Sequence, residues 1–327
     1  MKRREFLLGS AMTFAAGKVW AQSPDRGKLD RIAVMTLAFS EILKGPAHAD
    51  DPKRTLDILD APDMIASRYS IHHLELQHSH FISTELSYLR EFRDRVRKAN
   101  SHINQICLEF GILNISSPDP MLRVETIDLT KQWVDHAAEL GCPRVMVNQG
   151  TLAPEVRQTA IETLKTIGEY GKSRKVFVTM ENRGGGGGRG AVSAPSASAN
   201  STVGGAPAVA AGSVPGGAPA AGGTGPQTAG WDVVVEVIKA AGIYANPDTG
   251  NFPDEEARAA GLRAMYPLSS GSSHVHYNPA RFNEANAINI SKEVGYKGLY
   301  SIEATTINGP DPYTRVQIIL EELLKDI

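Results

Sequence analysis

The sequence has few cysteines, no excess of basic charge and no long apolar run. Its 327 residues include only Cys107 and Cys142, which excludes a disulfide scaffold. Each lies in or beside an apolar run, so we expect buried free thiols. The formal net charge of −2 at pH 7 argues against a nucleic-acid partner held by phosphate contacts. No apolar run reaches the length needed to span a bilayer in a mature chain, so we expect no stable membrane association.

The N-terminus has the composition of a targeting segment. The paired Arg3 and Arg4 precede a modest apolar region over residues 6–16, and Val19-Trp20-Ala21 resembles a cleavage site. The pattern resembles a twin-arginine (Tat) export signal, with an ordinary secretory signal as the alternative. It predicts that residues 1–21 direct the chain to the Tat export machinery and that the mature protein is periplasmic.

Residues 184–230 lack the large apolar side chains that form a hydrophobic core. They contain no aromatic residue, no leucine or isoleucine and a single charge, Arg189. Such a segment cannot bury enough apolar surface to offset its ordering entropy, so we expect a disordered Gly/Ala/Pro/Ser-rich insertion. The length left without this segment and the signal is close to the roughly 250 residues typical of a (β/α)₈ barrel. We therefore expect residues 22–327 to form one domain that contains the insertion.

The rest of the chain alternates between short apolar runs and amphipathic helical patterns. Strands are predicted at residues 31–37, 71–76, 103–108, 144–148, 175–181, 243–246, 274–277 and 299–303. Helices are predicted at residues 52–68, 86–99, 124–140, 155–170, 231–241, 254–265, 283–294 and 312–326. Eight strands, each followed by a helix, favour an α/β fold of the closed (β/α)₈ TIM barrel type over a doubly wound sheet, with the insertion after the fifth strand.

Polar side chains stand at the ends of the last four predicted strands. They are Glu181, Asp248, His276 and Glu303. In a barrel these strand ends are neighbours on one rim, so the four side chains can converge. Three carboxylates and one imidazole suit one divalent ion such as Mn²⁺, Mg²⁺ or Co²⁺, and they also accept Zn²⁺.

Several short segments carry a family resemblance. They are Asp248-Thr249-Gly250-Asn251-Phe252, His274-Val275-His276 and Ser301-Ile302-Glu303, together with residues 130–142, which are similar to the third helix of exported members. In order and spacing they resemble the xylose isomerase-like TIM barrels. These form the sugar phosphate isomerase/epimerase group of the AP endonuclease 2 superfamily, which shares a fold with endonuclease IV. The resemblance implies one divalent metal held by the four strand-end residues.

Two histidines compete for the place in the seventh strand. Both point to the same face, and we choose His276 as the metal ligand because it lies nearer the carboxyl end. His274 would lie one layer lower, as a packing residue or a substrate contact. The other candidate substrate-binding residues are Glu75, Asn148, Gln149 and Arg281.

The resemblance implies an isomerase or epimerase of a sugar or keto sugar. In such enzymes the metal binds a carbonyl and an adjacent hydroxyl, and two glutamates act as base and acid. Glu181 and Glu303 match that pair, unless both are ligands only. Export favours a free sugar over a sugar phosphate. The alternatives are a dehydratase or lyase on a keto sugar or inositol derivative, an endonuclease IV-like phosphodiesterase and a non-catalytic sugar-binding barrel.

Overall fold

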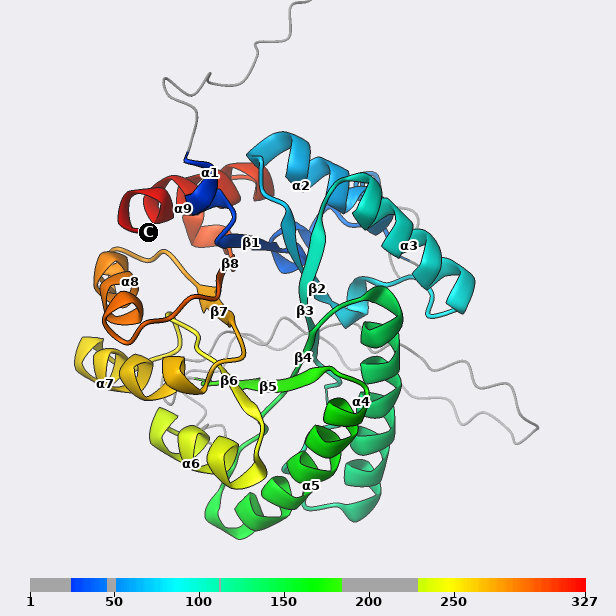
Figure 1. The fold of residues 1–327 in the computed structure, drawn as a ribbon, viewed down its shortest axis with the longest axis vertical. Coiled ribbons are helices and arrows are strands. Elements are labelled where there is room, and N and C mark those ends of the chain that lie inside the picture. Colours follow the sequence, from blue (N-terminus) through cyan, green and yellow to red (C-terminus); the bar gives the residue numbers. More distant parts are fainter. Residues whose placement is uncertain (1–24, 46–50, 112, 184–228) are drawn as a thin grey trace, which may run out of the picture.

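The computed structural model describes residues 25–45, 51–111, 113–183 and 229–327. Within them eight parallel strands form a nearly closed barrel, seen end-on in Figure 1, with hydrogen-bonded order β6-β5-β4-β3-β2-β1-β8-β7. The strands are β1 (Ile32–Met35), β2 (His73–Gln77), β3 (His102–Leu108), β4 (Arg144–Val147), β5 (Phe177–Glu181), β6 (Tyr244–Asn246), β7 (Ser272–Val275) and β8 (Leu299–Ile302). The predicted TIM barrel is confirmed. The predicted signal segment and residues 184–228, between β5 and α6, lie outside the described residues.

Helices surround the sheet on its outer side (Figure 1). The α-helices are α1 (Arg26–Leu29), α2 (Ala61–Tyr69), α3 (Leu86–Lys98), α4 (Pro120–Leu140), α5 (Pro154–Ser173), α6 (Trp231–Ala241), α7 (Glu255–Met265), α8 (Glu284–Glu293) and α9 (Pro312–Asp326). Short 3₁₀ helices are η1 (Thr36–Phe39), η3 (Ile58–Asp60), η4 (His78–His80), η5 (Tyr266–Leu268) and η6 (Thr306–Asn308).

The helix predicted over 52–68 was wrong in its first half. The structure has a turn and η3 there, and α2 begins only at Ala61. Pro62 explains the start, because proline lacks an N–H and is tolerated in the first turn of a helix but not in its interior. Both cysteines are buried and free, as predicted.

Side chains alternate across the sheet and divide the interior into two layers. On β5, Val178 and Met180 pack in the large apolar core between the sheet and the helices. The intervening Thr179 and Glu181 therefore face the barrel axis, where both are buried. The axis also holds a small apolar cluster of Met35, Cys107 and Met146. The barrel interior is thus rich in polar groups, whereas the outer core is apolar.

The seventh strand differs from its prediction by two residues. It was predicted at 274–277 and runs from Ser272 to Val275. Its two serines are buried, and Ser273 Oγ donates a hydrogen bond to Pro247 O at 2.7 Å, which satisfies a polar group in the core. His274 consequently lies inside β7, and His276 lies beyond its end.

The barrel closes at a seam between β6 and β7. An isolated parallel bridge joins Asp248 to His274. In it, Thr249 N donates to His274 O at 3.1 Å, and His274 N donates to Pro247 O at 2.9 Å. The seam therefore brings two of the candidate site residues together through their backbones.

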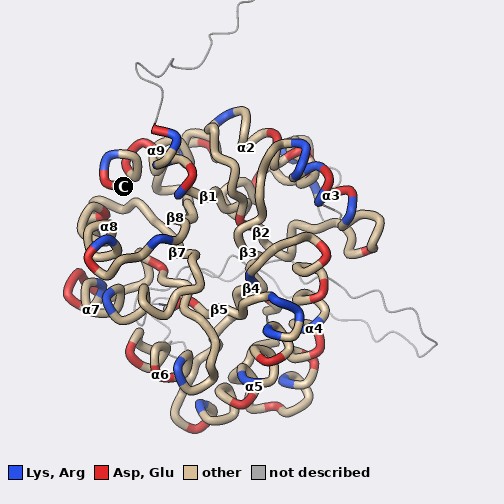
Figure 2. The backbone as a smooth tube through the Cα atoms, viewed as in Figure 1, with Lys and Arg blue, Asp and Glu red and all other residues tan. Residues whose placement is uncertain are grey.

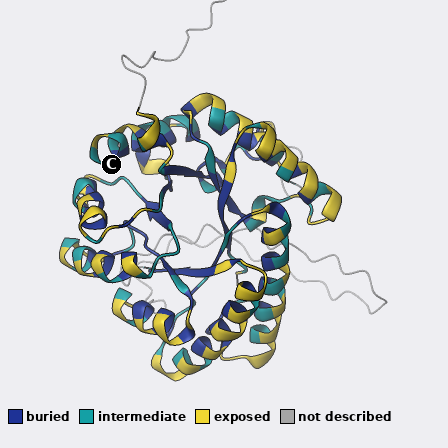
Figure 3. Cartoon of the chain, in the orientation of Figure 1, coloured by how far each residue is buried: buried dark blue, intermediate teal, exposed yellow. Residues whose placement is uncertain are grey.

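Charged residues lie mainly on the helices around the barrel (Figure 2), whose outward faces are exposed while the strands are buried (Figure 3). Among the described residues, no helix combines the length and hydropathy that crossing a membrane requires. Lys and Arg segments alternate with Asp and Glu segments along the described helices in this view (Figure 2).

Candidate metal centre

Four side chains from four consecutive strands converge at the carboxyl end of the barrel. Their ligand atoms lie within 4.8 Å of one another, and all four residues are buried: Glu181, Asp248, His274 and Glu303. The Nδ1 atom of His274 lies 3.0 Å from Glu181 Oε2, 3.2 Å from Glu303 Oε2 and 3.8 Å from Asp248 Oδ2. The imidazole therefore faces all three carboxylates with one nitrogen.

These separations can be compared with what a shared cation requires. Donor atoms about 2.0–2.2 Å from one ion, at octahedral to tetrahedral angles, are about 3.0–3.5 Å apart. The separations of 3.0 and 3.2 Å fall in that range, and the separation of 3.8 Å is slightly longer. Three buried carboxylates also repel one another, and a divalent ion would offset that repulsion. The residues present thus fit a divalent metal ion held by oxygen donors and one nitrogen.

His276 lies beside two members of this group. Its Nε2 is 3.2 Å from both Asp248 Oδ2 and Glu303 Oε2. The ring packs so closely on Gly250 that a Cβ there would lie 2.6 Å from its Cδ2 atom, so only glycine fits without a shift. The geometry places His274 in the four-residue group and His276 at its border, and the identity of the histidine ligand stays a prediction.

The buried charges shift one another's pKa values. Burial and the neighbouring Asp248 and Glu303 raise the pKa of Glu181, although His274 opposes this. Burial would lower the pKa of His276, but Asp248 and Glu303 raise it to about 10. Burial alone would raise the pKa of Asp248, but His276 and His274 outweigh burial and lower this pKa. A glutamate whose pKa is raised towards neutrality is better matched to general acid–base work.

The mouth of the site contains an ion-paired arginine that the sequence did not single out as a site residue. Arg183 Nε donates to Glu181 Oε1 at 2.9 Å, and its guanidinium also pairs with Glu109. Asn148 Nδ2 donates to the other oxygen of Glu109 at 3.3 Å. Glu109 directly follows β3, and this position at a strand end could have identified it from the sequence as a candidate site residue. Gln149 is fully buried next to Asn148, and neither atom of its amide has a partner among the described residues.

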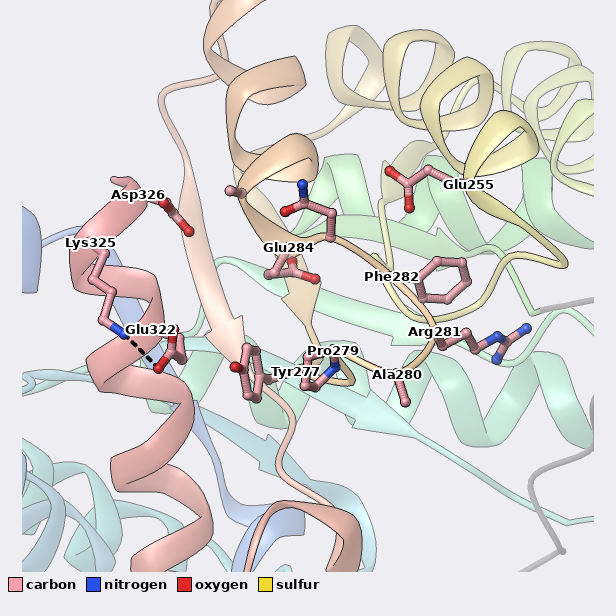
Figure 4. A pocket seen from close by; sticks show the side chains of 12 residues that line it. Glu255, Tyr277, Pro279, Ala280, Arg281, Phe282, Glu284, Glu322, Lys325 and Asp326 are labelled. Atoms are coloured by element: carbon pink, nitrogen blue, oxygen red, sulfur yellow. Dashed lines mark hydrogen bonds and ion pairs between the residues drawn. The ribbon is translucent and has the colours of Figure 1, made fainter.

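The last two predicted substrate contacts lie elsewhere. Glu75 is fully buried on β2, below His274. Arg281 donates to the carbonyl oxygen of Phe252 and stacks over Phe282. It lines a cavity of about 590 Å³ between the β7–α8 loop and α9 (Figure 4), and none of the four converging residues lines that cavity.

Comparison with known proteins agrees with this architecture. Residues 66–194 match the family described as xylose isomerase-like TIM barrel. The solved structures similar to this chain share its TIM-barrel fold. Curated proteins yield no match. The family match supports membership but spans less than half of the chain.

Solved structures similar to this chain include several sugar epimerases. A D-psicose 3-epimerase with D-tagatose from Clostridium cellulolyticum H10 has 10% identity and a TM-score of 0.61, covering 90% of this chain and 96% of its own. An L-ribulose 3-epimerase has 10% identity and a TM-score of 0.62, covering 90% and 94%. A D-allulose 3-epimerase from Methylomonas sp. has 11% identity and a TM-score of 0.61, covering 91% and 98%.

One histidine at the carboxyl end of the barrel should make stability depend on pH. His80 bonds Thr36 Oγ1 through Nδ1 at 3.0 Å and Ser40 Oγ through Nε2 at 3.1 Å. Burial lowers its pKa to about 3, so on acidification the unfolded chain takes up the proton first. We expect stability to fall as the pH drops below about 6.5, by about 2 kcal/mol at pH 5 from this group.

Urea unfolding at pH 7 and pH 5 checks this expectation. His80→Gln should lose about 2 kcal/mol less stability than the wild type between the two pH values. The exposed His102 provides the control, and His102→Gln should behave as the wild type does. Equal losses in the wild type and His80→Gln would show that His80 does not contribute.

Proposed function

We propose that this chain is a divalent-metal-dependent epimerase or isomerase of a keto sugar. The observation that carries the proposal is the convergence of Glu181, Asp248, His274 and Glu303 around one point at the carboxyl end of the barrel. The carboxyl face is where TIM barrels carry their chemistry. The likeness of the fold to sugar 3-epimerases supports the same class of reaction.

Glu181, Asp248 and Glu303 would hold the ion, together with one of two neighbouring histidines. These are His274 and His276. A bound divalent ion polarises a substrate carbonyl and so acidifies the adjacent C–H bond. Glu181 and Glu303 then provide one group to remove the proton and another to return it. Glu181 is prepared for this work because Arg183 orients one of its oxygens while the other faces the centre of the site.

Side chains at the mouth would bind the rest of a sugar. Asn148 follows β4 and reaches Glu109 at the mouth, while the buried amide of Gln149 has both a donor and an acceptor available among the described residues. A buried polar group without a partner is costly, and a hydroxyl of a sugar could satisfy both atoms. We propose that these two residues contact substrate hydroxyls.

Deuterium exchange tests the proposal. The protein, loaded with Mn²⁺ and then cleared of excess ion, is incubated with a panel of ketohexoses and ketopentoses in D₂O, and products are examined by NMR. We expect deuterium at a carbon next to the carbonyl, with or without an inverted centre. A deoxy product would instead assign the lyase alternative. No exchange with any sugar, by protein shown to contain the ion, would contradict the proposed chemistry.

We also propose that the chain is exported by the twin-arginine route. Replacing Arg3 and Arg4 together with lysine should leave the uncleaved precursor in the cytoplasm, since this route depends on the arginine pair. Cell fractionation and immunoblotting measure the precursor and the mature form. Lys2→Gln removes a neighbouring charge but keeps the pair, so it should be processed normally. Normal processing of the double variant would favour the ordinary secretory signal.

A further inference from the structure

Asn182 joins the strand ends that carry two carboxylates of the candidate metal centre. It directly follows Glu181, the last residue of β5, and it is 1% exposed. Its side chain reaches the turn after β6, where Oδ1 accepts from Asp248 N at 2.9 Å. Its Nδ2 donates to Asp248 O at 3.1 Å and to Asn251 O at 3.2 Å. The amide is therefore bonded to this turn at three points, and both hydrogens of its NH₂ group are used.

The backbone pairing of β5 with β6 stops just before this point. The last paired residues are Glu181 and Asn246. Pro247 comes next, and proline has no N–H with which to continue the ladder. A side-chain amide offers a donor and an acceptor of the same kind as a peptide group. Asn182 thus continues the attachment of the β6 end to β5 past the proline, with its side chain in place of the backbone.

The carboxylate of Asp248 is fixed within that same turn. Its Oδ1 accepts from Gly250 N at 2.7 Å, and its Oδ2 accepts from Asn251 Nδ2 at 2.7 Å. Both donors belong to the turn, so the carboxylate keeps its orientation relative to the turn. Asn182 attaches this turn to the residue beside Glu181, and the ligand atoms of Asp248 and Glu181 lie within 4.8 Å of each other. The separation of the two carboxylates therefore depends on the bonds that Asn182 makes.

Two other roles are open to a polar residue beside Glu181. One is a contact with substrate, but the Asn182 amide is buried and already bonded within the protein. The other is a contribution to folding alone, because buried polar groups need partners wherever they occur. A residue with that role alone would affect metal affinity no more than an equally buried hydrogen-bonded residue elsewhere in the chain.

We propose that Asn182 is a positioning residue, which holds the Asp248 turn against β5 and so keeps Asp248 and Glu181 at the separation that one divalent ion requires. This inference rests on the proposed metal site, in which both carboxylates are ligands whichever histidine completes the set. Without the three bonds of Asn182, the ion itself would have to order the turn, and ordering a mobile segment on binding lowers affinity. Residues that hold metal ligands in place typically contribute about 10- to 100-fold to affinity.

Calorimetric titration of Mn²⁺ into ion-free full-length protein measures this contribution. We expect Asn182→Ala to bind Mn²⁺ about 10- to 100-fold more weakly than the wild type. Ser291→Ala is the matched control, because Ser291 is fully buried on α8 and its hydroxyl bonds Ile288 O at 2.6 Å and Tyr300 OH at 2.5 Å, outside the turn. Both variants should destabilise the ion-free protein, but Ser291→Ala should bind Mn²⁺ within about threefold of the wild type.

Amide hydrogen exchange in the ion-free protein, followed by NMR, tests the contact without any metal. In the wild type the Asp248 N–H should exchange slowly, because it donates to Asn182 Oδ1. In Asn182→Ala it should exchange about 10-fold faster or more, since its acceptor is gone. The Tyr300 N–H, which donates to Arg31 O across β1 and β8, should keep its wild-type rate.

These outcomes separate the proposed metal site from the role of Asn182. A wild type that binds no divalent ion would contradict the metal site. Wild-type affinity in Asn182→Ala would overturn the positioning role, and so would an equal loss of affinity in Ser291→Ala. Rapid exchange of the Asp248 N–H in the folded wild type would also overturn it, and this result decides the matter even if Asn182→Ala does not fold.

Discussion

Glu303→Gln should abolish turnover while leaving the barrel folded. Loss of a group that transfers a proton costs about 100- to 10,000-fold in rate, and Glu303 also faces His274 at 3.2 Å in the proposed metal centre. The substitution preserves side-chain shape and removes both the titrating group and its charge. Rates of C–H exchange and of product formation measure the effect, and circular dichroism reports the fold.

The matched control lies at the mouth of the same site. Glu109 pairs with Arg183, which in turn bonds Glu181, but Glu109 is partly exposed and is not one of the converging residues. Glu109→Gln should therefore cost much less rate than Glu303→Gln. If Glu303→Gln kept a tenth or more of the wild-type rate and its metal content were unchanged, the two-glutamate mechanism would be wrong.

Binding of a divalent metal ion should make the folded chain considerably more stable. Without an ion, Glu181, Asp248 and Glu303 repel one another in a buried site. A ligand that binds only the folded chain stabilises it by about 4 kcal/mol at 1,000 times its dissociation constant. We expect Mn²⁺ to raise the midpoint of thermal unfolding by about 8–16 °C, assuming roughly 2–4 °C per kcal/mol, and we expect chelation to reverse the rise.

Calorimetric scans with Mn²⁺, with chelator and with chelator followed by fresh Mn²⁺ measure this change. Asp248→Asn removes one charged oxygen ligand and should lose most of the metal-dependent rise. Mg²⁺ and Zn²⁺ scans show which ion the site prefers. If all divalent ions left the midpoint unchanged in the wild type, the convergence of the four residues would not constitute a metal site.

The architecture could be predicted because its determinants are local. Alternation of apolar strands with amphipathic helices gave eight βα units, and the carboxylates at three strand ends gave Glu181, Asp248 and Glu303, which the structure brings together. Strand ends are informative in this fold, since every parallel strand delivers its last side chains to the same rim.

The details around β7 could not be predicted in the same way. Its sequence, Ser272-Ser273-His274-Val275, has no apolar run, and its register depends on hydrogen bonds to the residues that follow β6. The contact between His274 and Glu75 joins positions 199 residues apart. No local sequence pattern can predict a contact between residues so far apart in the chain. The choice of His276 over His274 as the metal ligand stays a prediction, although the strand boundary used for it lies two residues from the observed one.

The seam between β6 and β7 also bears on aggregation. The hydrogen-bonded order of the sheet begins at β6 and ends at β7, so these strands are its two edges. Unpaired edges invite pairing with other chains, and closed barrels avoid that hazard by having no edge. Here the bridge from Asp248 to His274 closes the gap, and the same two residues belong to the proposed metal centre. An ion bound there would fasten the barrel at the place where it can open, so protein kept free of metal should be the form prone to self-association.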